Sequence, residues 1–201
     1  MVLDLLGIFV FATTGALVAV RKQLDVFAAL VLAGVTGLGG GFIRDVLIGA
    51  TPPAALADWR YLMVPLAAGL VTFVFHPTVG RFERIIDGLD ACGLAVFCVT
   101  GAVKALAFGL GPLPAALMGR VTGIGGGMVR DVLAGRVPVV FSGSLYATPA
   151  LAGAGVVVVL HQYDVSFPVM AVAGFSVCLV WRLLALVNGW RAPLPKGPAS
   201  V

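Results

Sequence analysis

Residues 36–49 read Thr-Gly-Leu-Gly-Gly-Gly-Phe-Ile-Arg-Asp-Val-Leu-Ile-Gly, and residues 122–135, which lie 86 positions later, read Thr-Gly-Ile-Gly-Gly-Gly-Met-Val-Arg-Asp-Val-Leu-Ala-Gly. Ten of the fourteen positions are identical, so the chain contains a duplication. Each copy places three adjacent glycines and an Arg-Asp pair inside an apolar segment. Three interior glycines lower helix stability by about 3 kcal/mol relative to alanine, and a charge at bilayer depth costs about 2.5–3.5 kcal/mol. Because this unfavourable unit occurs twice, we predict that its glycines and charges serve a functional pathway.

The composition places the chain in a membrane. Of its 201 residues, 60% are hydrophobic and 11% are charged, and the mean hydropathy is +1.09, which excludes an ordinary water-soluble globule. The apolar stretches are long and nearly continuous, whereas a membrane β-barrel shows segments of about ten residues with alternating polarity. We therefore predict an all-α integral membrane protein with seven transmembrane helices, at about residues 3–20, 27–50, 61–78, 88–108, 113–135, 145–161 and 167–187.

The duplication extends beyond the glycine motif, because Asp4 matches Asp90 and Thr14 matches Thr100 at the same offset. Each repeat holds three predicted helices, and since three is odd, the second repeat crosses the membrane in the opposite direction. Such inverted repeats commonly place a substrate or ion site near the midplane. We predict one membrane domain, 1–201, made of a first repeat at 1–80, a second inverted repeat at 86–163, a seventh helix at 165–190 and a cytoplasmic tail at 191–201.

The basic residues of the loops predict the orientation. Seven crossings place seven lysines and arginines on one side of the membrane and only Arg60 on the other. By the positive-inside rule the first side is cytoplasmic, so we expect a multi-pass protein of the cytoplasmic (cell inner) membrane with its amino terminus outside. The net charge of +4 follows from this topology and does not require a nucleic-acid partner. The seven residues are Arg21, Lys22, Arg81, Arg84, Arg136, Arg191 and Lys196.

The triple glycines predict breaks in the second and fifth helices, because glycine allows the backbone to unwind at little steric cost. Unwinding frees carbonyl and amide groups that cannot face lipid, so we expect the breaks to line a wet cavity. Freed carbonyl oxygens there can replace water around a monovalent cation. The alternative is that the glycines only allow close helix packing. The glycines are Gly39, Gly40 and Gly41 in the second helix and Gly125, Gly126 and Gly127 in the fifth.

Each motif continues with an Arg-Asp pair, three positions after its last glycine. Neighbours on a helix diverge by about 100°, so we expect the arginine and the aspartate of a pair to reach different partners. An aspartate near the end of the first helix of each repeat lies at a suitable depth for the arginine. These charges form ion pairs that link helices, line the pathway, or do both. The pairs are Arg44-Asp45 and Arg130-Asp131, and the expected arginine partners are Asp4 and Asp90.

Two further charges break the symmetry of the repeats. Lys104 and Arg120 align with uncharged residues of the first repeat, Val18 and Gly34. They are candidates for a gate or for lipid contacts, since long basic side chains can extend to the membrane interface. No histidine is grouped with a nucleophile, and the cysteines lack metal-ligand spacing, so we expect no enzyme, no catalytic residue, no metal and no cofactor.

Two three-helix repeats with Gly-Gly-Gly-x-x-Arg-Asp in their second helices, followed by a seventh helix, closely resemble prokaryotic members of the trimeric intracellular cation channel (TRIC) family. The resemblance covers nearly the whole chain. It implies a homotrimer in which each subunit encloses an hourglass pore for monovalent cations, lined by the second and fifth helices. Potassium would be preferred over sodium only weakly, and no Thr-Val-Gly-Tyr-Gly filter is present. The lysine-rich stretch that binds phosphoinositide in animal members is not recognisable, although membrane lipids remain expected partners.

A second function fits the same pattern. Inverted repeats also build secondary transporters with alternating access, so the alternative is a carrier of a small zwitterion such as glycine. Resolved single-channel steps would identify a channel, whereas saturable uptake without unitary currents would identify a carrier.

Overall fold

The computed structural model describes residues 1–76 and 82–193. Within these ranges the regular elements are helices, apart from an isolated β-bridge between Ser144 and Arg191. The predicted all-α class is therefore confirmed for the described part of the chain. The α-helices are α1 (Val2–Arg21), α2 (Val26–Leu47), α3 (Ala54–Ala57), α4 (Trp59–Val74), α5 (Phe82–Ala107), α6 (Pro112–Leu133), α7 (Ala147–Gln162) and α8 (Phe167–Val187), and the 3-10 helix η2 spans Val139–Phe141.

Seven of the described helices have 16 to 26 residues and lie where the membrane-spanning segments are predicted. Four of them, α1, α2, α5 and α8, are long and apolar enough to cross a membrane, and α4 and α7 are shorter apolar helices. The count of seven crossings therefore stays a prediction. The predicted limits at residues 78 and 80, and most of the predicted tail 191–201, lie outside the described residues.

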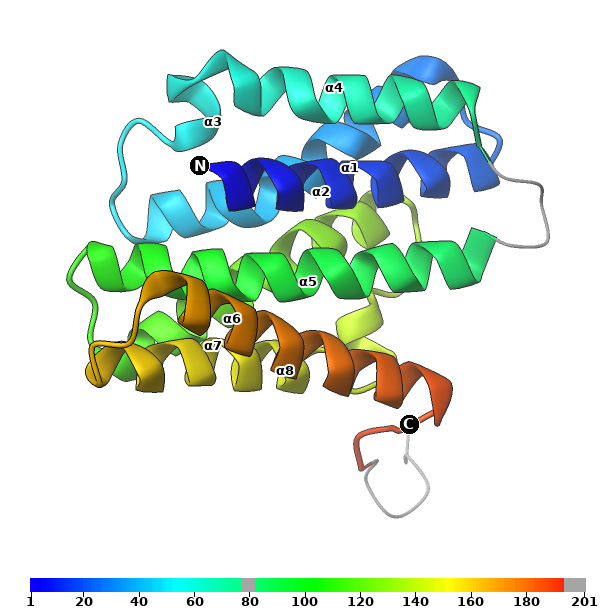
Figure 1. Cartoon of the computed structure of the whole chain (residues 1–201). Coiled ribbons are helices and arrows are strands. Elements are labelled where there is room, and N and C mark those ends of the chain that lie inside the picture. Colours follow the sequence, from blue (N-terminus) through cyan, green and yellow to red (C-terminus); the bar gives the residue numbers. More distant parts are fainter. Residues whose placement is uncertain (77–81, 194–201) are drawn as a thin grey trace, which may run out of the picture.

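The helices form a bundle with α1 and α5 side by side at its centre (Figure 1). Helix α2 packs on α1, α6 packs on α5, and α2 and α6 also pack on each other. Helix α4 covers the pair formed by α1 and α2, and α7 and α8 cover the pair formed by α5 and α6. This arrangement brings both copies of the glycine motif into the interior.

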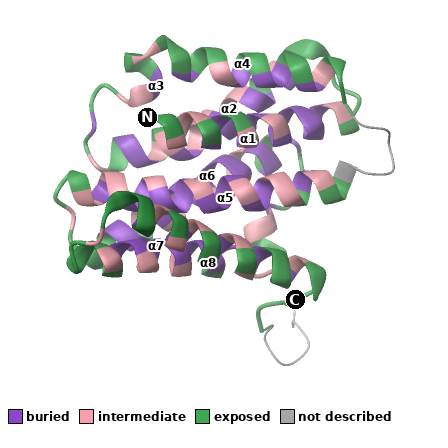
Figure 2. Cartoon of the chain, in the orientation of Figure 1, coloured by how far each residue is buried: buried purple, intermediate pink, exposed green. Residues whose placement is uncertain are grey.

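The outside of the bundle is apolar. Buried residues follow α1 and α5 where they meet, and exposed residues are concentrated on α4, α8 and the helix ends (Figure 2). Large apolar side chains are among the exposed ones, including Phe27 at 73%, Phe75 at 79% and Val187 at 84% exposure. So many exposed large apolar side chains are unusual in a water-soluble monomer. It is the surface expected of a protein that is solvated by lipid.

Helices α2 and α6 are continuous, so the predicted breaks at the triple glycines are wrong. Both glycine segments lie inside the helices. Three glycines lower helix stability by about 3 kcal/mol, whereas each backbone group without a hydrogen bond in a lipid environment costs several kcal/mol. Keeping the ladder of backbone hydrogen bonds is therefore more favourable than unwinding it.

Candidate functional site

The triple glycines form the contact between α2 and α6. A Cβ atom added to Gly40 would overlap the carbonyl oxygen of Thr122, and one added to Gly126 would overlap the carbonyl oxygen of Thr36. The two helices therefore approach each other as closely as their backbones allow, which is the packing role that the sequence left open. The preceding glycines, Gly39 and Gly125, lie against Gly126 and Gly40 across the same contact.

The third glycine of each motif has a different environment. A Cβ atom at Gly41 would lie 3.7 Å from Nη2 of Arg44, and one at Gly127 would lie 3.6 Å from Nη2 of Arg130. The added carbon would make an ordinary van der Waals contact with the guanidinium group that follows on the same helix, so each third glycine lies beside that group. The motif thus combines a helix contact with a neighbouring buried charge.

The first charge cluster consists of Asp4, Arg44, Asp45 and Lys104. Arg44 is only 1% exposed. Its Nη1 donates to Oδ1 of Asp4 at 3.2 Å, and its Nε donates to Oδ1 of Asp45 at 2.8 Å. Lys104 Nζ donates to the same Asp45 oxygen at 2.7 Å. The cluster joins α1, α2 and α5, and its formal charges cancel.

The second charge cluster consists of Asp90, Arg130, Asp131 and Arg136. Arg130 Nη1 donates to Oδ1 of Asp90 at 2.7 Å and also to Oγ1 of Thr14 at 2.9 Å. Arg130 Nε donates to Oδ1 of Asp131 at 2.9 Å, and Arg136 Nη2 donates to that oxygen at 2.6 Å. The second cluster therefore repeats the arrangement of the first and is likewise neutral.

The two clusters confirm the expected partners of the arginines on other helices. They contradict the expectation that each arginine does not pair with the aspartate that follows it. Arg44 contacts Asp4, and Arg130 contacts Asp90, as the depth of these residues suggests. The expectation that each arginine and its neighbouring aspartate avoid each other is wrong, because both pairs are bonded. The angle of about 100° separates the Cα–Cβ directions only. A long arginine side chain folds back far enough to reach the next residue.

The aspartates of the two motifs also hold the loops that follow. Oδ2 of Asp45 accepts a hydrogen bond from the backbone N–H of Ala54 at 3.0 Å, and Oδ2 of Asp131 accepts one from Val139 at 3.1 Å. These bonds fix the starts of α3 and η2, which the sequence does not predict. Each Asp carboxylate thus links a guanidinium group to a chain reversal.

The two symmetry-breaking charges have different surroundings. Lys104 belongs to the first charge cluster, where its side chain is 23% exposed. Arg120 lies half-buried in α6, and within the described residues it makes no hydrogen bond or ion pair. No group of three or more His, Cys, Asp or Glu side chains in the described ranges could hold a metal ion.

Arg182 of α8 is a buried charge whose contacts the sequence does not predict. It is 2% exposed, its Nη1 donates to the carbonyl oxygen of Leu145 at 2.9 Å, and its guanidinium lies 4.8 Å from the ring centroid of Tyr146. The Tyr146 hydroxyl and Oδ1 of Asp90 both lie close to Gly127, so Arg182 packs beside the second charge cluster from outside the repeats. The only sequence signal for this role is a charge within an apolar segment.

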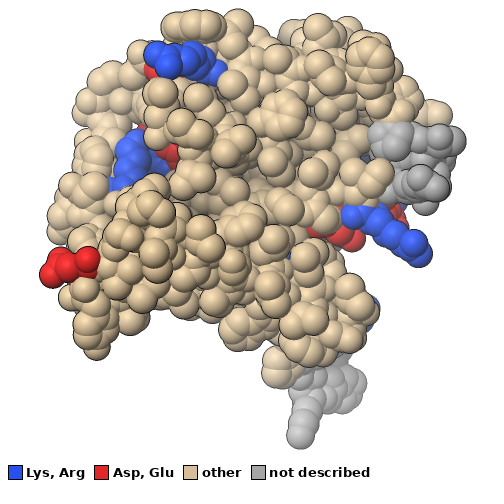
Figure 3. All heavy atoms as spheres, in the orientation of Figure 1, with Lys and Arg blue, Asp and Glu red and all other residues tan. Residues whose placement is uncertain are grey.

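Two cavities lie at opposite ends of α1. The first cavity, of about 440 Å³, borders the first charge cluster, and Figure 3 shows acidic and basic atoms together in a recess near that end of the molecule. The second cavity, of about 350 Å³, lies at the other end and reaches Arg136 of the second charge cluster. The first cavity is lined by Asp4, Tyr61, Thr100, Val103, Lys104 and Phe167, among others, and the second by Val18, Arg21, Lys22, Glu83 and Arg136.

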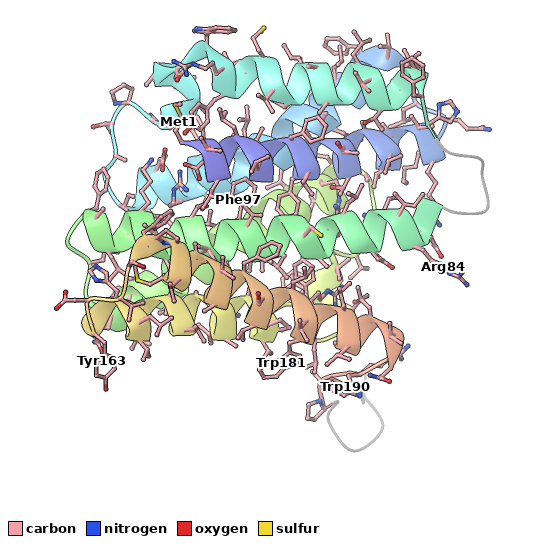
Figure 4. All side chains as sticks on the ribbon, in the orientation of Figure 1. Met1, Arg84, Phe97, Tyr163, Trp181 and Trp190 are labelled. Atoms are coloured by element: carbon pink, nitrogen blue, oxygen red, sulfur yellow. The ribbon has the colours of Figure 1, made fainter. Side chains whose placement is uncertain are left out.

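An aromatic pair lies between the two clusters. The rings of Phe11 and Phe97 have their centroids 5.3 Å apart, and both side chains are at most 1% exposed. Figure 4 shows Phe97 directed from α5 toward α1. Together with the contact between Gly40 and Gly126, this pair fills the interior between the two cavities.

The sequence matches a protein-family model described as "Glycine transporter" over residues 1–77 and 88–162. A UPF0126 membrane protein of Deinococcus radiodurans is 43% identical over 98% of this chain and 92% of its own length. A UPF0126 inner membrane protein of Escherichia coli strain K12 is 38% identical over 96% of this chain and 93% of its own length. These relatives match almost end to end.

Solved channel structures match the fold. The TRIC trimeric intracellular cation channel orthologue from Rhodobacter sphaeroides is 40% identical, with a TM-score of 0.90 over 94% of this chain and 97% of that one. A second structure, described as a basis for conductance through TRIC cation channels, is 34% identical, with a TM-score of 0.88 over 99% of this chain and 98% of that one. The fold is thus that of a channel-forming class of multi-pass membrane proteins. The chain belongs to the family of UPF0126 membrane proteins and prokaryotic TRIC channels.

Proposed function

We propose that the chain is a monovalent cation channel with weak preference for potassium and with one pore in each subunit of a homotrimer. The observation that carries this proposal is the pair of buried, neutral charge clusters, each of which borders a cavity at one end of the bundle. Similarity to TRIC cation channels over more than nine-tenths of the chain supports it. Potassium or sodium is the permeant ion, and no cofactor is needed.

The proposed pathway runs between α1, α2, α5 and α6 from the first cavity to the second. The interior between the cavities is closed in this structure by the Phe11–Phe97 pair and by the contact of α2 with α6. Conduction therefore requires α2 and α6 to separate at their glycines. Arg44 and Arg130 with their aspartates line this path, and the carboxylate oxygens offset the positive charge that would otherwise favour anions.

The proposed topology has seven crossings and an inverted repeat. In Figure 1 α5, α6 and α7 run opposite to α1, α2 and α4, respectively, which supports the inversion. Figure 4 places Met1 and Tyr163 at one end of the bundle and Arg84 and Trp190 at the other. The basic end is the cytoplasmic one by the positive-inside rule, so the amino terminus lies outside.

Lys104 and Arg120 have separate proposed roles. Lys104 is the candidate gate, because its ammonium group lies at the first cavity and forms an ion pair with Asp45. Arg120 has no protein partner in the described chain, so a lipid phosphate is its proposed partner in the membrane.

Potassium flux from proteoliposomes tests the proposed function. Vesicles loaded with KCl should release potassium only when the protein is present, at a rate that rises linearly with the potassium gradient. Saturable glycine uptake without potassium release would instead favour the second candidate, a secondary transporter of a small zwitterion. The observation that favours this second candidate is the description of the matching family model, "Glycine transporter".

A further inference from the structure

An apolar groove lies on the outer surface of α8, toward the end of that helix. Its volume is about 470 Å³, which is within the usual range for a ligand pocket. Three of its wall residues, Val180, Leu184 and Trp190, are 45–54% exposed, so the groove faces away from the bundle. We call it the α8 groove, and it is lined by Ser176, Val177, Val180, Trp181, Leu184 and Trp190.

The wall formed by Trp190 is held in place by the backbone. Gly189, with a φ of +64°, turns the chain back after α8. The backbone N–H of Trp190 then donates to the carbonyl oxygen of Ala185 at 3.0 Å, the bond pattern of a Schellman motif. The next residue, Arg191, pairs with Ser144 in the isolated β-bridge. Figure 4 shows Trp181 and Trp190 next to each other on the outside of the bundle, so the groove is a fixed part of the fold.

Arg191 adds a positive charge beside the α8 groove. Its side chain is exposed, and within the described ranges it makes no ion pair. The two segments that the β-bridge joins contain no acidic residue, because residues 132–146 and 165–201 include Arg136, Arg182, Arg191 and Lys196 but no Asp or Glu. The charge of Arg191 is therefore available to an anion outside the chain.

The groove and the charge together favour one ligand chemistry. An apolar groove on a membrane helix suits an acyl chain, and tryptophan is enriched at the depth where acyl chains meet headgroups. An arginine at that depth can extend to a lipid phosphate, and basic residues near the surface attract anionic lipids. A small soluble anion would leave the groove unfilled, and the positive group of a zwitterionic phospholipid would offset the attraction of its phosphate to Arg191.

We infer that the α8 groove binds an anionic phospholipid. One acyl chain lies along Trp181 and Trp190, and the phosphate accepts hydrogen bonds from Arg191. This site goes beyond ion conduction, because it lies on the outside of the bundle and does not require an open pathway.

Fluorescence quenching by brominated lipids tests the site in the full-length protein. The vesicles are phosphatidylcholine with about one phosphatidylglycerol in ten lipids, and the bromine is placed on the acyl chains of either the phosphatidylglycerol or an equal amount of the phosphatidylcholine. Trp59→Phe leaves Trp181 and Trp190 as the two tryptophans. The attraction of one basic residue enriches an anionic lipid by about fivefold, so brominated phosphatidylglycerol should quench this variant about threefold more strongly than brominated phosphatidylcholine.

Two matched controls separate a site from general surface charge. A protein with Trp181→Phe and Trp190→Phe reports only Trp59, which begins α4 at the opposite end of the bundle, and it should show equal quenching by the two labels. In the Trp59→Phe background, Arg191→Gln should remove the preference and Arg191→Lys should keep it. Arg84→Gln, which removes an exposed charge from the same end of the bundle, should leave it unchanged.

Three results would overturn the inference. Equal quenching of Trp181 and Trp190 by the two labels would mean that the groove does not select anionic lipid. Absence of quenching by either label would mean that protein covers the groove, either from a second copy or from another part of the chain. A preference that survives Arg191→Gln, or that Arg84→Gln abolishes equally, would mean that Arg191 does not hold the phosphate.

Discussion

Replacing Gly126 by alanine tests whether the triple glycine serves helix packing. Alanine is about 1 kcal/mol more favourable than glycine inside a helix. The added Cβ would overlap the carbonyl oxygen of Thr36, a backbone atom that cannot rotate away. Overpacking of this kind costs about 1–3 kcal/mol, so we expect Gly126→Ala to lower the free energy of unfolding by up to about 2 kcal/mol.

The matched control is Gly34→Ala in α2, where an added Cβ would have no atom within 4 Å. This change should leave stability unchanged or raise it by up to about 1 kcal/mol. Reversible unfolding in mixed micelles of detergent and sodium dodecyl sulfate would give both free energies. Equal stability of the two variants would refute the close contact between α2 and α6, since an unwound segment would tolerate both changes.

Other substitutions test the charges. Asp4→Asn and Arg44→Gln should each destabilise the protein, and their effects should be coupled by about 0.5–3 kcal/mol in a double-mutant cycle, whereas additivity would show that the pair does not interact. Lys104→Gln should raise single-channel potassium current at low salt by about twofold, because the first cavity loses a positive charge; an unchanged current would remove Lys104 from the pathway. Arg182→Gln should lower the thermal stability of the fold more than Arg60→Gln, an exposed control, and equal melting temperatures would contradict the support that Arg182 gives to the second charge cluster.

The sequence predicts the helices and the cross-helix ion pairs because each depends on local or repeated patterns. Apolar segments separated by basic or glycine-rich turns locate the seven long helices. The offset of 86 residues relates Asp4 to Asp90, and the depth of each aspartate suggests an arginine partner. Both partners are in contact in the structure.

The sequence does not predict the continuity of α2 and α6. Glycine lowers helix stability by itself, but the decisive contact is with a carbonyl group on another helix, more than 80 residues away in the chain. Arg182 is missed for a similar reason, since its burial depends on how α8 packs beside Tyr146.

A planar bilayer recording of the purified protein tests the central proposal most directly. With 150 mM KCl on one side and about tenfold less on the other, a cation-selective pathway should give a reversal potential near about 59 mV in magnitude with the sign for potassium. One pore in each subunit predicts three equally spaced conductance levels. A reversal potential with the sign for chloride, or the absence of unitary currents from the well-folded protein, would contradict the proposed cation channel.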